Sequence, residues 1–289
     1  MSERFPQDWL KLRESADLAA RSPTLARRFA AALPARRPLR LIDLGSGTGA
    51  NTRALLPRIT GDQDWRLIDR DRELLVAQAE EFTLWARRQG YPITAGGGRA
   101  RIEAQPAHWE IEAMPLDLDH DLATLGEAEF DGITAASFFD LVSREWLERF
   151  IALLVEHPAP FLAVLNVDGR REWQPQLADD ALVAEAFAAH QRRVKDFGAA
   201  LGSAAPDVMD ALLQQAGFHV ERAATDWRLA PRDAALLAAL IAGEAAAARE
   251  AAPEAAVRID AWEQRRGGLL GENKLALIIG HCDLLALPA

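Results

Sequence analysis

The sequence of 289 residues contains only one cysteine, Cys282. A single cysteine excludes a disulfide framework and a thiolate metal site within one chain. Residues 1–15 are charged and amphipathic, and they lack the apolar run of a secretory signal. The chain also lacks an apolar stretch long enough to cross a bilayer. These absences predict a protein of the reducing cytoplasm.

Basic residues are in the minority. Lys and Arg number 33 against 43 Asp and Glu, which gives a formal net charge of −10. This net negative charge repels a polyanion such as a nucleic acid, so binding one would require a strong local basic patch. We therefore expect neither a nucleic-acid nor a membrane partner. Hydrophobic residues make up 49% of the chain, which is enough for a large domain with a core.

Strand-like and helix-like segments alternate along most of the chain. This alternation predicts an α/β fold with a mostly parallel sheet and helices on both faces. Residues 7–33 carry apolar residues at helical spacing, so we expect an N-terminal helical cap within residues 1–35. The main domain is then residues 36–289. Its expected strands are residues 39–44, 65–68, 101–104, 130–135, 160–167, 218–223 and 274–280.

Residues 169–205 interrupt the alternation. They follow the fifth expected strand and contain a helical stretch over about 179–194. We interpret them as an insertion that lies over the open end of the sheet and caps a substrate. Residues 90–98 hold four glycines and a proline and are expected to form a loop.

The strongest functional pattern is the segment RLIDLGSGTGAN at residues 40–51. A buried strand enters a glycine-rich turn there, and a helix begins directly after it. Glycine lets a backbone approach a ligand closely and adopt positive φ, and the free N–H groups of a helix start face such a ligand. A turn of this kind at the carboxyl end of a first strand is typical of nucleotide-type sites. The alternative is a tight turn that binds no ligand. We disfavour it because three glycines would then cost conformational entropy on folding without a compensating role.

The glycine spacing favours one family of such sites. A dinucleotide fingerprint reads G-x-G-x-x-G, whereas Gly45, Gly47 and Gly49 alternate and Asp43 precedes them by two residues. This arrangement resembles motif I of class I S-adenosylmethionine-dependent methyltransferases. The resemblance implies S-adenosyl-L-methionine as cofactor and a Rossmann-like sheet of seven strands. It also implies that Asp43 helps to position the amino-acid portion of the cofactor.

Two further acidic positions agree with this resemblance. Asp69 closes the second expected strand, where a carboxylate accepts hydrogen bonds from ribose hydroxyls; the alternative is a surface aspartate that caps the next helix. Asp117 and Leu118 follow the third strand, where the family commonly has an acidic residue near the adenine amino group. Asp119, His120 and Asp121 lie beside them, but we favour a solvated acidic loop over a metal site and expect no metal.

Arg13 or Arg21 on the first helix is suited to pair with the methionine carboxylate. The alternative for Arg13 is an ordinary i, i+4 pair with Asp17. The fourth strand leads into Ser137 and Phe138, where the family lines the cofactor and acceptor sites, although Phe138 is equally suited to the core. The expected cofactor contacts are Arg13, Asp43, Gly45, Ser46, Gly47, Gly49, Asn51, Asp69, Arg70, Asp117, Leu118, Ser137 and Phe138.

The acceptor site is harder to locate, because methyl transfer requires mainly alignment of the acceptor with an already activated donor. A base is needed only if the acceptor must lose a proton. Charged and aromatic residues gather in segments 168–173 and 190–198, which suggests a polar, anionic acceptor. The alternative is a solvated helix face with ion pairs. Weaker candidates are Asp226 and Trp227 after the sixth expected strand and His281 and Asp283 after the last one, because strand ends often carry polar residues.

We expect acid–base roles for His190, Asp168 and Asp140, and acceptor contacts from Arg171, Trp173, Arg193 and Asp226.

These features predict a methyltransferase that acts on an oxygen, nitrogen or carbon atom of a small molecule. Alternatives are an RNA or protein methyltransferase, or a protein that binds S-adenosylmethionine without transferring its methyl group. The run around Arg193 is too short a basic patch to outweigh the net charge. The sequence also lacks an Asn/Asp-Pro-Pro-Tyr/Phe motif after the fourth strand, which argues against the amino-methyltransferases of DNA. A nicotinamide dehydrogenase is disfavoured by the glycine spacing.

Overall fold

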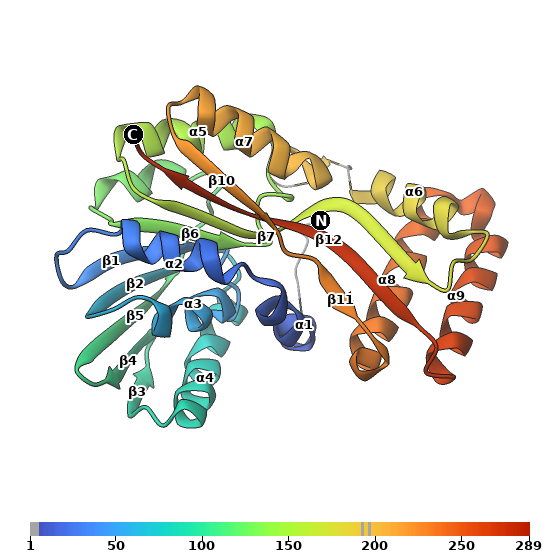
Figure 1. Cartoon of the computed structure of the whole chain (residues 1–289), viewed down its shortest axis with the longest axis horizontal. Coiled ribbons are helices and arrows are strands. Elements are labelled where there is room, and N and C mark those ends of the chain that lie inside the picture. Colours follow the sequence, from blue (N-terminus) through green and yellow to red (C-terminus); the bar gives the residue numbers. More distant parts are fainter. Residues whose placement is uncertain (1–5, 192–193, 196–197) are drawn as a thin grey trace.

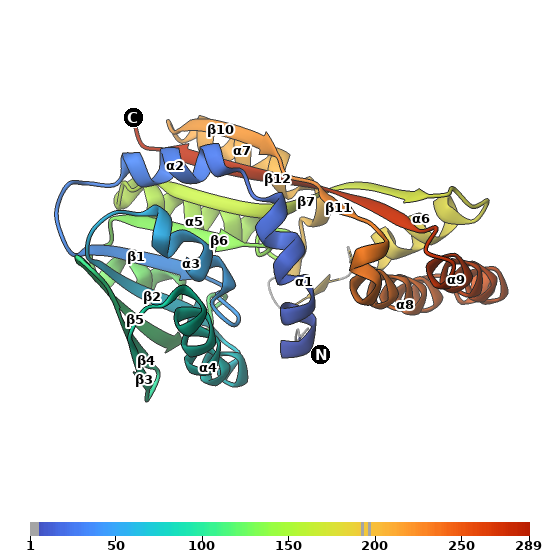
Figure 2. The same ribbon diagram turned by 60° about the horizontal axis from the view of Figure 1, so that its bottom comes forward.

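The computed structural model describes residues 6–191, 194–195 and 198–289 (Figures 1 and 2). Within these residues, ten strands form one mixed sheet. Its central strands are parallel, and β1 and β6 are buried along nearly their whole length, as in a sheet covered on both faces. In spatial order the parallel strands are β7 (Phe161–Gln174), β6 (Gly132–Ala136), β1 (Leu39–Leu44), β2 (Gln63–Asp69) and β5 (Ala107–Pro115).

Antiparallel strands flank this centre on both sides. Beyond β7 come β12 (Ala276–Leu287) and then β10 (His219–Ala224). Beyond β5 come β4 (Arg99–Ala104) and then β3 (Ile93–Gly96). A separate short pair consists of β8 (Val194–Lys195) and β9 (Gly198–Ala199). The sheet thus contains the expected Rossmann-like α/β arrangement of seven strands and three additional strands, β3, β4 and β11 (Trp227–Leu229).

The expectation for the third strand was wrong. Residues 101–104 belong to the antiparallel β4, and the parallel strand beside β2 is β5. The expected loop at 90–98 contains β3, and Gly97 and Gly98 turn the chain back with φ of 63° and 78°. Such positive φ values suit a two-residue hairpin turn. The alternation of buried Trp109 and Ile111 with charged neighbours in β5 is the period-two signal of a strand.

Helices cover the two faces of the sheet (Figure 2). One face packs against α2 (Pro23–Ala32), α3 (Ala50–Leu55) and α4 (Arg72–Gln89). The other packs against α5 (Arg144–Glu156) and α7 (Ala205–Gln215). The short 3₁₀ turns are Leu56–Arg58, Leu122–Glu127, Gly202–Ala204, Pro231–Asp233 and Pro253–Ala255.

Local signals set the bounds of several helices. The side chain of Asp71 caps α4 by accepting from the N–H groups of Glu73 and Leu74, and Gly90 ends the helix in the left-handed conformation. Ser143 caps α5 by accepting from the N–H of Trp146. These local capping residues therefore fix both ends of α4 and the start of α5.

A second lobe extends from the sheet on two long strands (Figure 1). The carboxyl half of β7 pairs there with the amino half of β12, and β11 pairs with β12 as well. Three helices pack on these arms: α6 (Asp180–Gln191), α8 (Ala234–Ala251) and α9 (Ala256–Gly271). Residues 169–174 therefore continue a strand, and the lobe also takes in segments well outside the expected insertion at 169–205.

The lobe has its own core. Trp173 packs edge-on against Trp262, and the guanidinium of the fully buried Arg266 lies over both rings. Arg266 is paired with Asp180, which also accepts from the indole N–H of Trp262. A buried cation is tolerated here because its charge is paired with that of Asp180. Trp173 is thus part of the lobe's packing.

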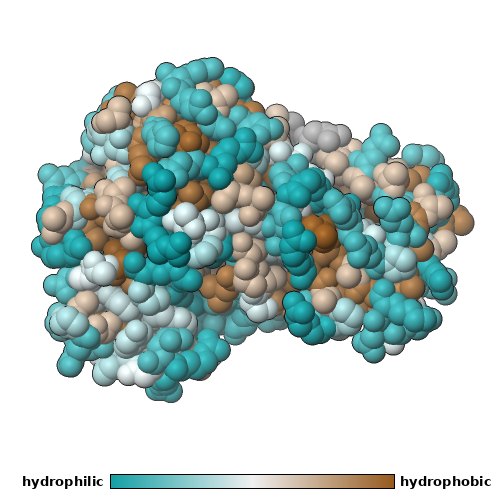
Figure 3. Space-filling model, viewed as in Figure 1, coloured by the Kyte–Doolittle hydropathy of each residue, from teal (hydrophilic) through white to brown (hydrophobic). Residues whose placement is uncertain are grey.

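Helix α1 (Gln7–Ala20) stands between the sheet and this lobe (Figures 1 and 2). It contacts β11 and α8 of the lobe. Hydrophilic residues cover most of the molecular face seen in Figure 3. Among the described residues, no helix has both the length and the apolar character to span a membrane.

The aromatic cluster beneath α5 gives a test of the sheet packing. Phe150 is fully buried, stacks on Trp146 at 5.6 Å between ring centroids and lies 5.1 Å from Phe161. We expect Phe150→Ala to lower the free energy of unfolding by about 3–5 kcal/mol, because it leaves a cavity. Val257→Ala, at a side chain that is 83% exposed, should change it by less than about 0.5 kcal/mol. Urea unfolding followed by tryptophan fluorescence measures both, and equal effects would contradict this packing.

Candidate functional site

The glycine turn after β1 adopts the conformation that its sequence predicts. Gly45, Gly47 and Gly49 have φ of 60°, 53° and 81°, a region that glycine enters without steric cost. A Cβ at Gly45 would lie 2.5 Å from the ring of Phe138, and one at Gly49 would lie 2.6 Å from the ring of Phe82. Larger residues would therefore displace the walls of the turn.

A buried carboxylate holds the start of α3 against β1. Asp43 accepts from Asn51 Nδ2 at 2.7 Å and from Thr52 Oγ1 at 2.8 Å. Burial raises the pKa of Asp43 to about 6, although the hydrogen bonds from Asn51 and Thr52 oppose this shift. Asp43 and Gly49 are not among the residues that line the cavity described below. Asp43 thus stabilises the turn through Asn51 and Thr52 without itself lining the cavity.

Asp69 fixes the same turn from β2. Its Oδ2 accepts from the backbone N–H of Gly47 at 2.8 Å, and its Oδ1 accepts from that of Asp71 at 2.9 Å. Burial raises the pKa of Asp69, and these two hydrogen bonds oppose the shift. The carboxylate therefore lies beside the glycine turn at the carboxyl edge of the sheet.

A cavity of about 670 Å³ opens at this edge, where the carboxyl ends of β1, β2, β5 and β6 meet α1. Its volume falls within the range of sites for drug-sized ligands. The expected cofactor residues that line it are Arg13, Gly45, Ser46, Gly47, Asn51, Asp69, Arg70, Asp117, Leu118, Ser137 and Phe138. The structure thus gathers segments far apart in sequence around one space.

Two arginines of the N-terminal segment reach this cavity. Arg13 donates to Asp17 at 2.9 Å and, through Nη2, to Ser137 Oγ at 2.6 Å. The expected i, i+4 pair with Asp17 is therefore present together with a contact to the sheet edge. Arg21 donates to Asn51 Oδ1 at 2.6 Å, and its Nε is buried without a partner among the described residues. Burial lowers the pKa of Arg21, so an anion placed beside it would be stabilised.

A smaller cavity of about 150 Å³ adjoins the first, with which it shares Arg13, Ser137 and Leu141. It lies between the sheet edge, α1 and the lobe. Of the predicted catalytic and acceptor-binding residues, Asp140 and Arg171 line it. Its remaining walls are Trp9, Val167, Phe187, Gln191, Gly202, Trp227, Leu240, Ile279 and His281.

Several predicted residues lie elsewhere. His190 faces Glu250 of α8, with Nε2 3.1 Å from a carboxylate oxygen. Asp168 and Asp226 both pair with Arg170, at 2.7 and 2.6 Å. None of these side chains is among those that line the two cavities. Their charges are balanced by ion pairs, which was the alternative that the sequence left open.

Of the remaining predicted acceptor contacts, only Arg171 is found at a cavity. Trp173 donates to Glu244 at 3.2 Å within the lobe's core and lines neither cavity. Arg193 lies outside the described residues. Arg171 reaches the smaller cavity, where its guanidinium lies over the Phe187 ring at 4.9 Å and donates to Glu244 at 2.6 Å.

His281, a weaker candidate from the sequence, lines the smaller cavity. The expected last strand ended at residue 280, whereas β12 continues to Leu287 and buries His281 inside the sheet. Its Nδ1 lies 3.0 Å from the carbonyl oxygen of Ile279. Burial, with the nearby charge of Arg13, lowers the pKa of His281 to about 4. The signal was a histidine within an otherwise apolar run.

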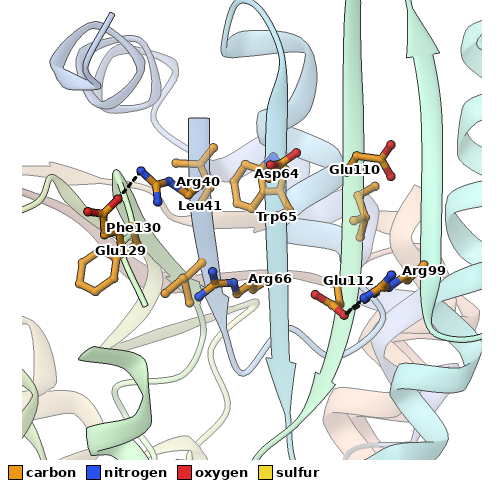
Figure 4. Close-up of a pocket in the computed structure, with 12 residues that line it drawn as sticks. Arg40, Leu41, Asp64, Trp65, Arg66, Arg99, Glu110, Glu112, Glu129 and Phe130 are labelled. Carbon is orange, nitrogen blue, oxygen red and sulfur yellow. Dashed lines mark hydrogen bonds and ion pairs between the residues drawn. The ribbon is translucent and has the colours of Figure 1, made fainter. Parts of the chain in front are cut away.

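A third hollow, of about 320 Å³, lies on the sheet face and is shown in Figure 4. Charged side chains from neighbouring strands line it, including Asp64, and the pairs Arg40–Glu129 and Arg99–Glu112 lie at 2.5 and 2.7 Å. It contains none of the predicted site residues. Because ligands of open α/β sheets bind at the carboxyl ends of strands, we assign the functional site to the other two cavities.

No protein-family model and no curated protein matches the chain. Solved structures do. A cyclopropane synthase from Mycobacterium tuberculosis is 11% identical, with a TM-score of 0.50 over 98% of this chain and 94% of that one. A methyltransferase from Geobacter sulfurreducens in complex with S-adenosyl-L-homocysteine is 17% identical, with a TM-score of 0.45 over 99% of both chains. A sarcosine dimethylglycine methyltransferase, so described, from Galdieria sulphuraria is 12% identical, with a TM-score of 0.44 over 99% of this chain and 92% of that one.

The strand order and the likeness to the Mycobacterium tuberculosis protein show the fold. The parallel strands β5, β2, β1, β6 and β7, followed by an antiparallel β12, form the class I S-adenosylmethionine-dependent methyltransferase fold. The fold that the glycine motif implied is confirmed.

The titration of Asp43 gives a test of the turn. Its pKa is about 6 in the folded chain, against about 3.9 for an unfolded aspartate. Between pH 7 and pH 5 the folded chain therefore takes up a proton that the unfolded chain does not. An asparagine side chain cannot titrate, so wild type should gain about 1 kcal/mol relative to Asp43→Asn as the pH falls across this range. Urea unfolding of both proteins at pH 7 and pH 5 measures this difference, and parallel changes would refute the burial of a titrating carboxylate.

Proposed function

We propose that the chain is a methyltransferase that uses S-adenosyl-L-methionine to methylate a small molecule. The observation that supports this proposal is the larger cavity. It combines a glycine turn, a carboxylate at the end of β2 and a carboxylate after β5 with two arginines from the N-terminal segment. Neither of the other two hollows described above carries this set.

The polar residues of the larger cavity match the ribose, the adenine and the methionine carboxylate of the cofactor in turn. Asp69 would accept a hydrogen bond from a ribose hydroxyl, and Asp117 would lie beside the adenine. Arg21, with its unpartnered Nε and its lowered pKa, would pair with the methionine carboxylate. The glycine turn leaves room for the cofactor because no Cβ projects from Gly45 or Gly47. In this proposal the remaining expected contacts, such as Ser46 and Leu118, complete the walls.

The two adjoining cavities suit methyl transfer. The cofactor supplies an activated methyl group, and the protein supplies alignment of the acceptor behind it. Arg13, Ser137 and Leu141 form the boundary that both cavities share. Residues at this boundary would orient an acceptor in the smaller cavity toward a methyl donor in the larger one.

The size and charge of the smaller cavity support a small acceptor. About 150 Å³ of space is enclosed between α1, the sheet edge and the lobe, so α1 and the lobe act as caps. A nucleic-acid acceptor is opposed by the net charge of −10. The lone Cys282 agrees with a reducing, cytoplasmic setting.

Calorimetry with S-adenosyl-L-homocysteine tests this proposal. We expect binding to wild type, and Asp69→Ala should weaken it about tenfold or more, because a charge-assisted hydrogen bond and the anchor of the glycine turn are both lost. Asp64→Ala removes a carboxylate from the same strand, at the hollow of Figure 4, and should leave the affinity unchanged. Absence of binding by wild type, or equal affinities of the two variants, would overturn the proposal.

A further inference from the structure

The smaller cavity has a largely aromatic and aliphatic wall. The rings of Trp9, Trp227 and Phe187 line it together with side chains such as Leu240 and Val167. Such walls bind the apolar body of a ligand, and a few placed polar groups fix its orientation. The chemistry of the acceptor is therefore set by the polar groups that reach this space.

His281 brings a polar ring with a defined tautomer to the wall of the cavity. Because Nδ1 lies 3.0 Å from the carbonyl oxygen of Ile279, this nitrogen must carry the hydrogen and donate. Nε2 of the neutral ring is then a hydrogen-bond acceptor. The ring is held beside Trp227, with centroids 5.1 Å apart. His281 lines the cavity, and the residues that the structure describes give its Nε2 no hydrogen-bond partner.

Both cations that line the cavity, Arg13 and Arg171, are already paired, and Asp140 adds a carboxylate to the wall that opposes an anionic ligand. Arg13 pairs with Asp17 at 2.9 Å, and Arg171 pairs with Glu244 at 2.5 Å. An anionic ligand would compete with these carboxylates, and a cationic ligand would meet two guanidinium groups. The cavity therefore favours a neutral ligand, in contrast to the anionic acceptor that the sequence suggested.

We propose that the methyl acceptor is a small, neutral ring compound with a hydroxyl group, and that Nε2 of His281 accepts the hydrogen of this hydroxyl. This inference rests on the proposed function and names its substrate class. During transfer, the hydroxyl oxygen bonds to the methyl carbon as the carbon–sulfur bond breaks, and the electron pair of that bond stays on sulfur. The hydroxyl proton moves to Nε2 and then to water.

The electrostatic surroundings suit a base that releases its proton again. The charged groups that act on His281 are Arg13 and Asp17 from α1 and Asp168 from β7. Burial and Arg13 together lower the pKa of His281 to about 4. The ring is thus neutral and ready to accept at physiological pH. Once the acceptor oxygen carries a methyl group, its proton is far more acidic than an imidazolium, so even this weak base takes it up.

Phenol and anisole are probes that differ only in the ability to donate a hydrogen bond. Ligand-observed NMR should show phenol bound to wild type saturated with S-adenosyl-L-homocysteine, about tenfold more tightly than anisole. Benzylamine and benzoate, charged analogues, should bind more weakly than phenol. Phenol binding should stay constant between pH 6 and pH 8, since His281 is neutral throughout this range.

Variants at His281 complete the test. His281→Phe should abolish the preference for phenol over anisole, whereas His219→Phe, at a histidine exposed on β10, should retain it. His281→Gln keeps an acceptor in place of the ring and covers the case in which the phenylalanine variant fails to fold. Normal affinity for S-adenosyl-L-homocysteine shows that a variant is folded and that the proposed function stands.

Three results would overturn this inference while leaving the proposed function intact. The first is failure of phenol to bind wild type that binds S-adenosyl-L-homocysteine. The second is an equal phenol preference in a folded His281→Phe protein. The third is a loss of phenol binding centred near pH 6.5, the value of an unperturbed histidine.

Discussion

The guanidinium of Arg13 is the point on which the arrangement of the site depends. It joins three parts of the molecule, because it donates to Ser137 at the sheet edge, pairs with Asp17 on α1 and lies 5.0 Å over the ring of Trp227 in the lobe. Asp17 in turn accepts from the indole N–H of Trp227. This one charged group thus fixes α1, the sheet edge and the lobe around the boundary of the two cavities. Its positive charge also contributes to the lowered pKa of His281.

Buried carboxylates give the sheet edge a fixed shape. Asp43 holds the start of α3, and Asp283 on β12 accepts from the backbone N–H groups of Ser22 and Leu165 and from Thr225 Oγ1. Each carboxylate has its oxygens satisfied by hydrogen bonds, which offsets much of the cost of burying it. These contacts connect segments that are remote in sequence. Buried hydrogen bonds therefore tie the turn and the strands that frame the cavities to one another.

The glycine turn and the carboxylate beside it could be predicted because their information is local. Strand, glycine turn and helix follow one another within residues 39–55, and Asp69 ends the next strand, so spacing alone places them at one edge. The errors arose where long-range pairing decides. Trp173 was placed in an insertion, but β7 continues through residues 169–174 by pairing with β12, and the Trp173 side chain packs in the core of the lobe. His190 lies on α6, where its ring faces Glu250 of α8.

The same long pairing explains why the acceptor half could not be found by spacing. Arg171 and His281 face one small cavity because β7 and β12 lie side by side with two shifts in register, at Ile279/His281 and Cys282/Leu284. A register shift changes which residues of a strand face a given side. The sequence of a single strand does not encode this choice, since it depends on the partner strand. The make-up of the smaller cavity is thus a property of the paired arms, whereas the glycine turn is a property of a single strand–turn–helix unit.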